Sequence, residues 1–196
     1  MIVGSECIVL GTQQDTQLSV SHIYRMLPIY RKSSEGNSYI FFESKDDDDY
    51  YYTRVNEAGP STKTRKVNIP FFGYPMMDRA WLENKLYKTA APHKAISQVM
   101  MRDSKIDVKA VYVSLQDPIT SCPAVTEQCS DGKVITYKRD DNRCLHFDSC
   151  VTPERCSYYT PKCFSGYKLI SVPSPRRGCP RFICDAEFLS ETGPSV

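Results

Sequence analysis

The chain has 196 residues and a net charge of +2, the difference between 25 basic and 23 acidic side chains. This length accommodates one ordinary domain, or a domain with a small module. The balanced charge excludes a global field that would attract nucleic acid or an anionic membrane, and no apolar run approaches the roughly 18 residues of a membrane span. We therefore expect no nucleic-acid partner and no membrane span.

The first seven residues, Met-Ile-Val-Gly-Ser-Glu-Cys, have no basic n-region and no apolar h-region. They are not predicted to be a signal peptide. If the protein is secreted, a signal has been removed or the chain is a fragment.

The first half of the chain is rich in strand-forming residues. The segments 38–42 and 50–55 predict two strands of a hairpin joined by the acidic stretch 44–49, and 27–30 predicts a preceding strand. The apolar segment 67–72 contains Pro70, which has no N–H to donate and so indicates an edge or extended segment.

Helical signals follow this region. Asp78 is a predicted N-cap for a helix over 79–88, in which Leu82 and Leu86 lie four residues apart on one face. The segment 94–102 predicts a second short helix that buries Ile96, Val99 and Met100. The alternation in 107–115 then predicts a strand that places Val111, Val113 and Leu115 on one face.

Cysteine usage changes abruptly along the chain. Eight of the nine cysteines lie between residues 122 and 184, and residues 8–121 contain none. The shift marks a boundary in the segment 117–121, where proline and small polar residues suit a linker. The predicted fold is thus an α+β domain over 1–117, mostly β with a short helical segment, followed by a small disulfide-rich β tandem.

The eight cysteines form two copies of one pattern. The gaps are 6, 14 and 5 residues in the first copy and 6, 15 and 4 in the second. A glycine stands three residues after the second cysteine of each copy and a phenylalanine three residues after the third. Shared spacing with these residues indicates a tandem duplication. We predict modules over 122–150 and 156–184, followed by a flexible tail over 185–196. The repeated residues are Cys122, Cys129, Cys144, Cys150, Gly132 and Phe147 in the first copy, and Cys156, Cys163, Cys179, Cys184, Gly166 and Phe182 in the second.

Each module is too short to bury a self-sufficient core, so crosslinks are expected. The glycine supplies the positive φ of a tight turn, and the β-prone stretch after it can form a hairpin. Four cysteines allow three pairings; we favour first-to-third and second-to-fourth, which ties both ends of the hairpin. Zinc is the alternative, but its ligands typically come as close pairs, and only Cys179 and Cys184 approach that spacing. Disulfides at this density indicate an oxidising compartment, hence an extracellular protein.

The second module carries a family resemblance. The stretch Cys163-Phe-Ser-Gly-Tyr-Lys-Leu-Ile and the closing Gly178-Cys-Pro-Arg-Phe-Ile-Cys resemble the C-terminal half of von Willebrand factor type C-like and related secreted cysteine-rich modules. The resemblance covers about 30 residues, or about 60 with the first module. It implies an extracellular adhesive, matrix or growth-factor-binding module and brings no catalytic residues.

Four aspartates followed by three tyrosines are the strongest local charge feature. Three interpretations remain open: a solvated hairpin loop, tyrosine sulfation beside acidic residues, and a calcium site. A calcium loop spaces its ligands with turns and glycine, which this run lacks. The candidate partner loop consists of Asp46, Asp47, Asp48, Asp49, Tyr50, Tyr51 and Tyr52.

Basic clusters occur at 63–66 and at Arg176 and Arg177, with Arg181 nearby. The second cluster lies between Cys163 and Cys179, taken as a stapled pair, and would be displayed on that loop. Four interpretations of this cluster remain open: a solvated loop, a glycosaminoglycan patch, a processing site, and an inhibitory loop that offers arginine to a trypsin-like protease.

Cys7 is left over by count. An odd cysteine in a secreted chain indicates an interchain disulfide or a partner lost with a truncated segment, and the alternative is a buried free thiol.

Catalytic signals are absent from the sequence. Neither His22, His93 nor His146 has a nucleophile or metal-ligand partner at helical spacing, and no phosphate-binding loop or hydrolase motif is present. We expect no enzyme activity, no cofactor and no metal.

The resulting hypothesis is a secreted, non-enzymatic structural, adhesive or assembly protein of the extracellular matrix or a surface coat, with protein partners or self-assembly. The alternative is a protease inhibitor or growth-factor-binding antagonist that acts through the basic loop near Arg176 and Arg177.

Overall fold

The computed structural model describes residues 6–29, 36–46, 49–87, 93–103, 105–116, 121–157 and 159–189. The chain forms two compact units. The barrel unit comprises residues 1–73 and 82–116, and the disulfide unit comprises residues 74–81 and 117–196. The short segment 74–81 therefore belongs with the cysteine-rich part of the chain although it lies far from it in sequence.

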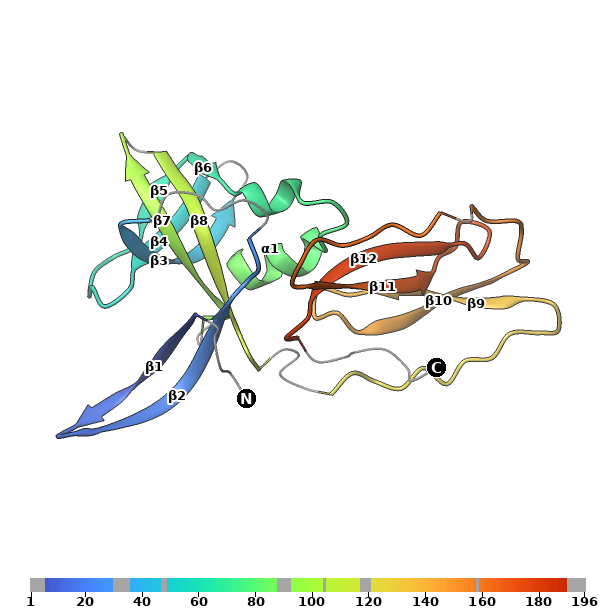
Figure 1. Cartoon of the computed structure of the whole chain (residues 1–196), viewed down its shortest axis with the longest axis horizontal. Coiled ribbons are helices and arrows are strands. Elements are labelled where there is room, and N and C mark those ends of the chain that lie inside the picture. The colour runs from blue at the N-terminus through green and yellow to red at the C-terminus, as the bar shows by residue number, and fades with distance from the viewer. Residues whose placement is uncertain are drawn as a thin grey trace. The chain divides into compact units, whose positions relative to one another are not determined.

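The barrel unit contains eight strands. Their order in the sheet is β1-β2-β8-β7-β3-β4-β5, and β6 pairs in parallel with β8 (Figure 1). The strands are β1 (Cys7–Gln14), β2 (Gln17–Met26), β3 (Ser38–Asp46), β4 (Asp49–Arg54), β5 (Thr62–Thr64), β6 (Lys66–Asn68), β7 (Ala95–Arg102) and β8 (Lys105–Ser114).

Part of the sheet closes into a five-stranded barrel, whose strands in chain order are β3, β4, the continuous segment β5–β6, β7 and β8. Only Arg65 separates β5, which pairs with β4, from β6, which pairs with β8, so the sheet returns on itself. The helix α1 (Arg79–Tyr87) lies in sequence between the third barrel strand, β5–β6, and the fourth, β7. This order, with a parallel pair between the third and fifth strands, is the topology of OB-fold barrels. A topology does not by itself assign a ligand.

The predicted hairpin over 38–55 is confirmed. β3 and β4 pair in antiparallel fashion and extend into the acidic stretch, as far as Asp46 opposite Asp49. Ile40 and Phe42 are buried in alternation along β3, which places Tyr39 and Phe41 on the opposite face.

The prediction of a second helix over 94–102 is wrong, because these residues form β7. The strand pairs with β8 on one side and β3 on the other. Ile96 and Val99 are both fully buried although they lie on opposite faces of the strand. Burial on both faces removes the alternation typical of a half-buried strand and leaves a three-residue spacing that resembles a helix.

The predicted strand over 27–30 is also wrong. β2 ends at Met26, and Leu27 donates one more backbone hydrogen bond, to the carbonyl of Val111 at 2.8 Å. Pro28 has no N–H with which to continue the ladder. Residue 30 lies outside the described residues. The sequence analysis did not predict the β1–β2 hairpin, which joins the sheet through Tyr24–Met26 and otherwise extends away from the barrel (Figure 1).

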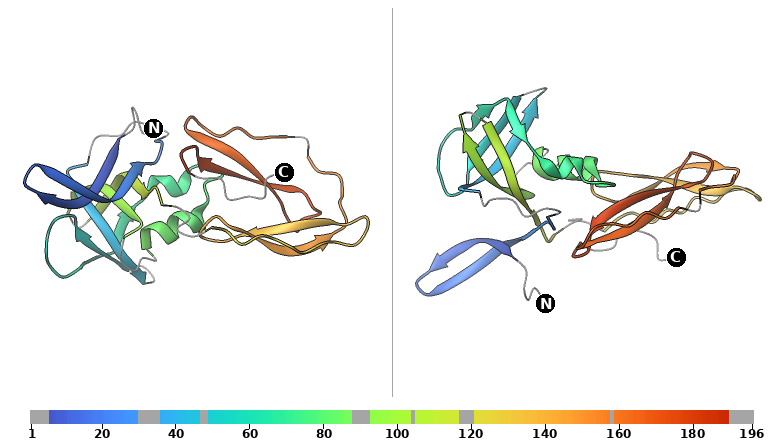
Figure 2. Two further views of the ribbon diagram at one scale, coloured as in Figure 1. Left: turned by 90° about the horizontal axis from the view of Figure 1, so that it is seen from below. Right: turned by 45° about the horizontal axis from the view of Figure 1, so that its top comes forward.

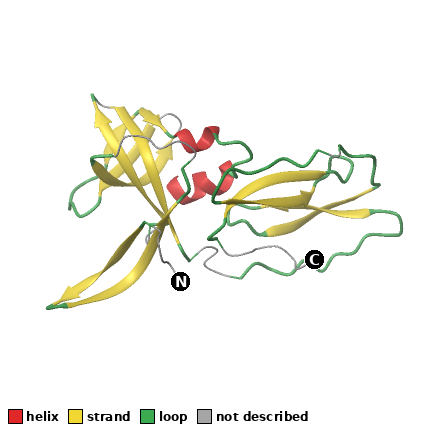
Figure 3. Ribbon diagram, in the orientation of Figure 1, coloured by secondary structure: helices red, strands yellow, loops and turns green. Residues whose placement is uncertain are grey.

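The helix predicted over 79–88 is confirmed as α1, and the strand predicted over 107–115 as β8, in which Val111 and Val113 are buried while Leu115 lies just beyond its end. The carboxylate of Asp78 accepts a hydrogen bond from the backbone N–H of Trp81 at 3.3 Å, the geometry of an N-cap. The segment 67–72 divides at its proline: β6 precedes it, and a 3₁₀ helix, Pro70–Gly73, begins there. Among the described residues, α1 and this 3₁₀ helix are the helical elements (Figure 3).

The disulfide unit consists of two hairpins, β9 (Val134–Arg139) with β10 (Leu145–Val151) and β11 (Tyr167–Pro173) with β12 (Pro180–Ala186) (Figure 2). Gly132 and Gly166 have φ values of 76° and 85°, as the turn role requires. Four disulfides join the first cysteine to the third and the second to the fourth within each module, the pairing favoured from the sequence. They are Cys122–Cys144, Cys129–Cys150, Cys156–Cys179 and Cys163–Cys184.

Both spacing differences between the modules have structural counterparts. In the first module the register of β10 shifts between Phe147 and Ser149, and Asp148 is the extra residue of a β-bulge. The bulge accommodates the additional residue between the third and fourth cysteines. In the second module the hairpin turn spans residues 174–179, against 140–144 in the first, which accounts for its longer middle gap.

The second module extends beyond the predicted end at Cys184. β12 continues through Asp185 and Ala186, and both side chains are buried. Leu189 is also buried. The predicted tail over 185–196 therefore begins too early, and residues 190–196 lie outside the described part of the chain.

Candidate functional site

At the acidic end of the β3–β4 hairpin, Asp49 forms two ion pairs. Asp49 lies 2.6 Å from the Lys63 Nζ and 2.7 Å from the Arg65 Nε, both on the neighbouring segment β5–β6. The hydrogen bonds from Lys63 and Arg65 lower the pKa of Asp49. Asp47 and Asp48 lie outside the described residues.

Strand alternation divides the three tyrosines between two faces. Tyr50 packs edge-on against Phe42 and Tyr87, with ring centroids 6.3 and 5.5 Å away, and so belongs to the packed interior face. Tyr51 lies directly opposite Lys63 in the β4–β5 ladder, and the Lys63 ammonium stands 5.9 Å from its ring centroid.

One polar surface, the Tyr51 face, therefore lies on β4 and the segment β5–β6 and consists of Asp49, Tyr51, Lys63 and Arg65. Its two cations and one carboxylate leave one positive charge, and the Lys63 and Arg65 side chains are 48% and 73% exposed. This surface can offer an aromatic ring and charge-assisted donors to a partner. Within the described segments no three metal-ligating side chains gather, and two of the four aspartates of the calcium interpretation lie outside these segments.

The disulfide unit contains a buried ionic cluster that the sequence analysis did not predict. Arg139, at the end of β9, donates two hydrogen bonds to the carboxylate of Asp185 at 3.0 and 2.5 Å and a third to Asp78 at 2.9 Å. Arg143 adds a bond to Asp185 at 3.3 Å. These side chains are at most 6% exposed.

This cluster connects three separate stretches of sequence. Asp78 comes from the segment 74–81, the arginines from the first module, and Asp185 from the second. Burial raises the pKa of Asp78, against the opposing effect of Arg139. Two cations and two carboxylates balance in charge, so the cluster fixes the mutual position of the three stretches rather than attracting a charged ligand. No short-range signal in the sequence points to it.

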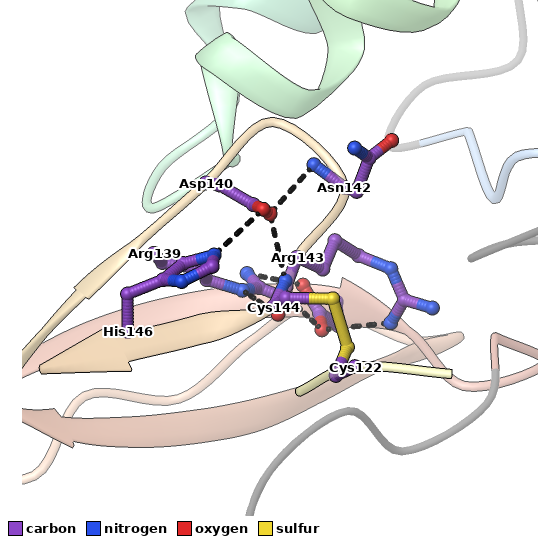
Figure 4. The surroundings of a disulfide bond; sticks show 8 residues. Cys122, Arg139, Asp140, Asn142, Arg143, Cys144 and His146 are labelled. Atoms are coloured by element: carbon purple, nitrogen blue, oxygen red, sulfur yellow. Dashed lines mark hydrogen bonds and ion pairs between the residues drawn. A yellow bond between two sulfur atoms is a disulfide. The ribbon is translucent and has the colours of Figure 1, made fainter. Parts of the chain in front are cut away.

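A second carboxylate organises the turn that carries Arg143 (Figure 4). Asp140 accepts backbone hydrogen bonds from Asn142 and Cys144, each at 2.9 Å, and lies 2.9 Å from the Nε2 of His146. Burial raises the pKa of Asp140, but the hydrogen bonds from His146, Cys144 and Asn142 outweigh it, so the pKa lies below its ordinary value. His146 thus has a structural role beside the Cys122–Cys144 disulfide.

The other two histidines, His93 and His22, lie in the barrel unit, and the buried Nδ1 of His93 has no hydrogen-bond partner among the described residues. The His93 ring stacks on Phe41 with centroids 4.1 Å apart, and its Nε2 lies 3.7 Å from Glu43. His22 contacts the neighbouring Ser21 hydroxyl at 3.1 Å on the exposed β1–β2 hairpin. That hydroxyl donates to the backbone carbonyl of Leu10, which leaves it poorly placed as a nucleophile.

The basic loop forms the β11–β12 turn. Arg177 has a φ of 60°, and its guanidinium lies 3.2 Å from Glu154. The prediction that Cys163 and Cys179 staple this loop together is wrong, since each bonds to a different cysteine. Arg176 lies in the same turn, and Arg181 is exposed on β12.

Cys7 is a half-buried free cysteine at the start of β1. It pairs with Arg25 of β2, and its other strand edge has no neighbour in the described sheet. Both the interchain and the free-thiol interpretations remain compatible with this position.

The chain is similar to a protein of known sequence along most of its length. An uncharacterized protein of Dictyostelium discoideum is 29% identical over 208 residues, which cover 94% of this chain and 70% of the relative. No protein-family model matches the chain. No solved structure matches it either. Within the described residues, no helix is long and apolar enough to cross a membrane. The similarity thus covers nearly the whole of this chain, across both units.

Proposed function

We propose that the protein is a secreted, non-enzymatic structural or adhesive protein of the extracellular matrix or a surface coat, and that it acts by binding protein partners. The duplicated framework of four disulfides is the observation that carries the proposal. Disulfides persist in oxidising environments and are rare in the cytosol. The modules are proposed to be related to von Willebrand factor type C-like modules, in accordance with the Cys-Pro-Arg-Phe-Ile-Cys closure.

The two units have different proposed roles. The modules serve as a rigid scaffold, because their buried charged side chains pair with one another: Arg139 and Arg143 both donate hydrogen bonds to Asp185. The barrel unit carries the partner surface, the Tyr51 face. Tyr51 provides rigid aromatic contact and Arg65 provides directional donors, and tyrosine and arginine are both enriched at protein interfaces.

Self-assembly is supported by the β1–β2 hairpin. β1 has an open edge in the described sheet, and Val9, Leu18 and Val20 are 44%, 53% and 45% exposed. An open edge with exposed apolar side chains favours pairing with another chain. Alternation places Cys7 on the same face of β1 as Val9.

Two measurements test the proposal. Antibody detection in source cells should find the protein outside the cell with its module disulfides formed; a reduced protein confined to the cytosol would overturn it. Crosslinking and mass spectrometry of the native protein should then recover partner peptides joined to β4–β5.

A matched pair of variants assigns the surface. The Tyr51→Ala, Lys63→Ala double variant should lose the crosslinked partner, and Lys133→Ala, an exposed lysine of the disulfide unit, should retain it. Equal recovery by both variants would exclude the Tyr51 face.

The inhibitor or antagonist alternative depends on Arg176 and Arg177 being offered to a partner. Arg177 lies in a tight turn and is ion-paired with Glu154, which favours the scaffold role of this loop. Trypsin titration should therefore show no stoichiometric inhibition. Inhibition that disappears in the Arg176→Ala, Arg177→Ala variant would instead support the alternative, and a ligand-capture assay tests antagonism separately.

A further inference from the structure

The outer face of the barrel unit contains a cavity of about 370 Å³ beside Tyr39. Its apolar lining comes from Ile8 of β1, Ile96 of β7 and Val55, and its polar lining from Asn37, Arg54, Asn56 and Glu57. The volume lies at the lower end of the range for small-ligand pockets. Nothing in the Tyr51 face or the disulfide unit contributes to it.

The aromatic wall is held in place and remains accessible. Tyr39 is 37% exposed, and its hydroxyl accepts a hydrogen bond from the Gln98 amide at 3.0 Å. That bond orients the ring and satisfies the hydroxyl, so the remaining free surface of the side chain is its apolar ring. A fixed aromatic ring beside polar groups suits the apolar C–H face of a ring-shaped, hydroxylated ligand.

Two side-chain amides remain available at the rim. The side chains of Asn37 and Asn56 have no hydrogen-bond partner within the described residues. Asn56 has a φ of 65°, which a glycine would also accommodate, so an amide is not needed for the turn itself. An amide presents both donors and an acceptor, as hydroxyl groups require.

The charge of the rim selects against ions. The Arg54 Nη1 lies 3.4 Å from the Glu57 Oε1, and the two exposed charges cancel. A phosphate, a sulfate or a cation therefore gains little from the pocket. A neutral ligand that can donate to Glu57 and accept from Arg54 finds both groups within one rim.

Main-chain recognition of a peptide is also disfavoured here. The Tyr39 carbonyl accepts from the Val55 N–H at 2.9 Å, and the Asn37 N–H donates to the Val99 carbonyl at 2.9 Å. β3 is paired on both sides at this point, with β4 and with β7. An added strand would find no open edge at the floor of the pocket.

We propose that this cavity, the Tyr39 pocket, binds a neutral saccharide of one or two rings. The ring of Tyr39 covers the apolar face of the sugar, and Asn37, Asn56, Arg54 and Glu57 bind its hydroxyl groups. This site goes beyond the proposed adhesive function and is independent of the Tyr51 face. Loss of partner crosslinking at β4–β5 would therefore leave it unaffected.

Calorimetric titration of the intact, disulfide-bonded protein tests the proposal. The probes are lactose and diacetylchitobiose as neutral disaccharides, and a heparin disaccharide as the anionic control. We expect binding of at least one neutral probe. Absence of binding by both neutral probes at millimolar concentration, or binding of the heparin disaccharide alone, overturns the proposal.

Variants locate the site. Asn37→Ala with Asn56→Gly should weaken binding about tenfold or more, because two hydrogen bonds are lost without disturbing the Asn56 backbone. Tyr39→Ala removes the ring that covers the sugar and should also weaken binding about tenfold or more. Gln128→Ala removes an exposed amide of the disulfide unit and should have no effect. Thermal melting verifies folding of each variant. Unchanged binding by the folded double variant would place the saccharide elsewhere and overturn the proposal.

Discussion

Arg143 and Gly178 occupy the same position in the two modules, directly before the third cysteine, and each has a φ of 70°. Glycine adopts this conformation without steric cost, whereas arginine does not. The Arg143 side chain is fully buried and reaches Asp185 of the other module. The duplicated turn is thus strained in one copy, and the strained residue supplies a contact between the two copies.

Replacing Arg143 with glycine tests which effect dominates. The change relieves the backbone strain but removes one of the two arginines that pair with the buried Asp185. Loss of a partner from a buried ion pair costs more than such strain, so we expect the free energy of unfolding to fall by roughly 2 kcal/mol. Denaturant titration measures it. Arg143→Lys, which keeps both charge and strain, should fall in between; a gain in stability for Arg143→Gly would show that strain dominates.

Gly178 and Gly132 provide a matched pair for the same backbone effect. Both have positive φ, but a Cβ at Gly178 would lie 2.8 Å from the Val134 Cγ2, whereas one at Gly132 would meet no atom within 4 Å. Gly132→Ala should cost about 1 kcal/mol from backbone strain alone, and Gly178→Ala distinctly more. Adding Val134→Ala to Gly178→Ala should recover part of the difference. Equal costs for the two single variants would contradict the steric contact.

Asp78 should give the stability of the disulfide unit a characteristic pH dependence. Burial raises its pKa above the unfolded value near 3.8. A raised pKa in the folded state gives stability that is complete below the unfolded pKa and is lost as the pH rises through the folded pKa. Asp78→Asn keeps an N-cap and does not titrate, so the advantage of the native chain over this variant should shrink from acid toward neutral pH.

Asp140 is the control of opposite sign for that experiment. Its pKa is lowered, so its contribution is present above the unfolded value and is lost as the pH falls through the folded pKa. Stability curves of Asp78→Asn and Asp140→Asn should therefore diverge from the native curve in opposite directions. Parallel curves would contradict the assigned pKa directions.

Thiol counting tests the framework as a whole. Under denaturing, non-reducing conditions we expect one reactive thiol per chain, from Cys7, and nine after reduction, from the nine cysteines of the sequence. A covalent dimer that loses even this thiol would establish the interchain interpretation. Eight additional free thiols in the native protein would contradict the disulfides.

Removal of one disulfide from each module should have similar effects, because the loops they close are similar, with separations of 22 and 23 residues for Cys122–Cys144 and Cys156–Cys179. Replacing either pair with serine should cost about 2–5 kcal/mol in free energy of unfolding, measured by denaturant titration. A cost confined to one of the two pairs would contradict equal contributions of the two disulfides.

The sequence by itself determined the features that depend on short-range spacing. Repeated cysteine gaps and the following glycines, Gly132 and Gly166, predict the hairpin modules and favour the observed disulfide pairing among the three possible ones, because a hairpin brings its own ends together. Asp78 as an N-cap and the β3–β4 hairpin were predictable for the same reason, since both form between near neighbours.

Only the tertiary structure decided the features that depend on contacts between distant residues. β7 is a strand because β3 and β8 bury both of its faces, which removes the alternation from its sequence. The barrel closes only when β6 meets β8. The buried cluster likewise unites Asp78, Arg139 and Asp185, three residues that share no local pattern. Charge pairing across such separations leaves no periodic trace in a sequence, because it depends on where the folded backbone brings each side chain.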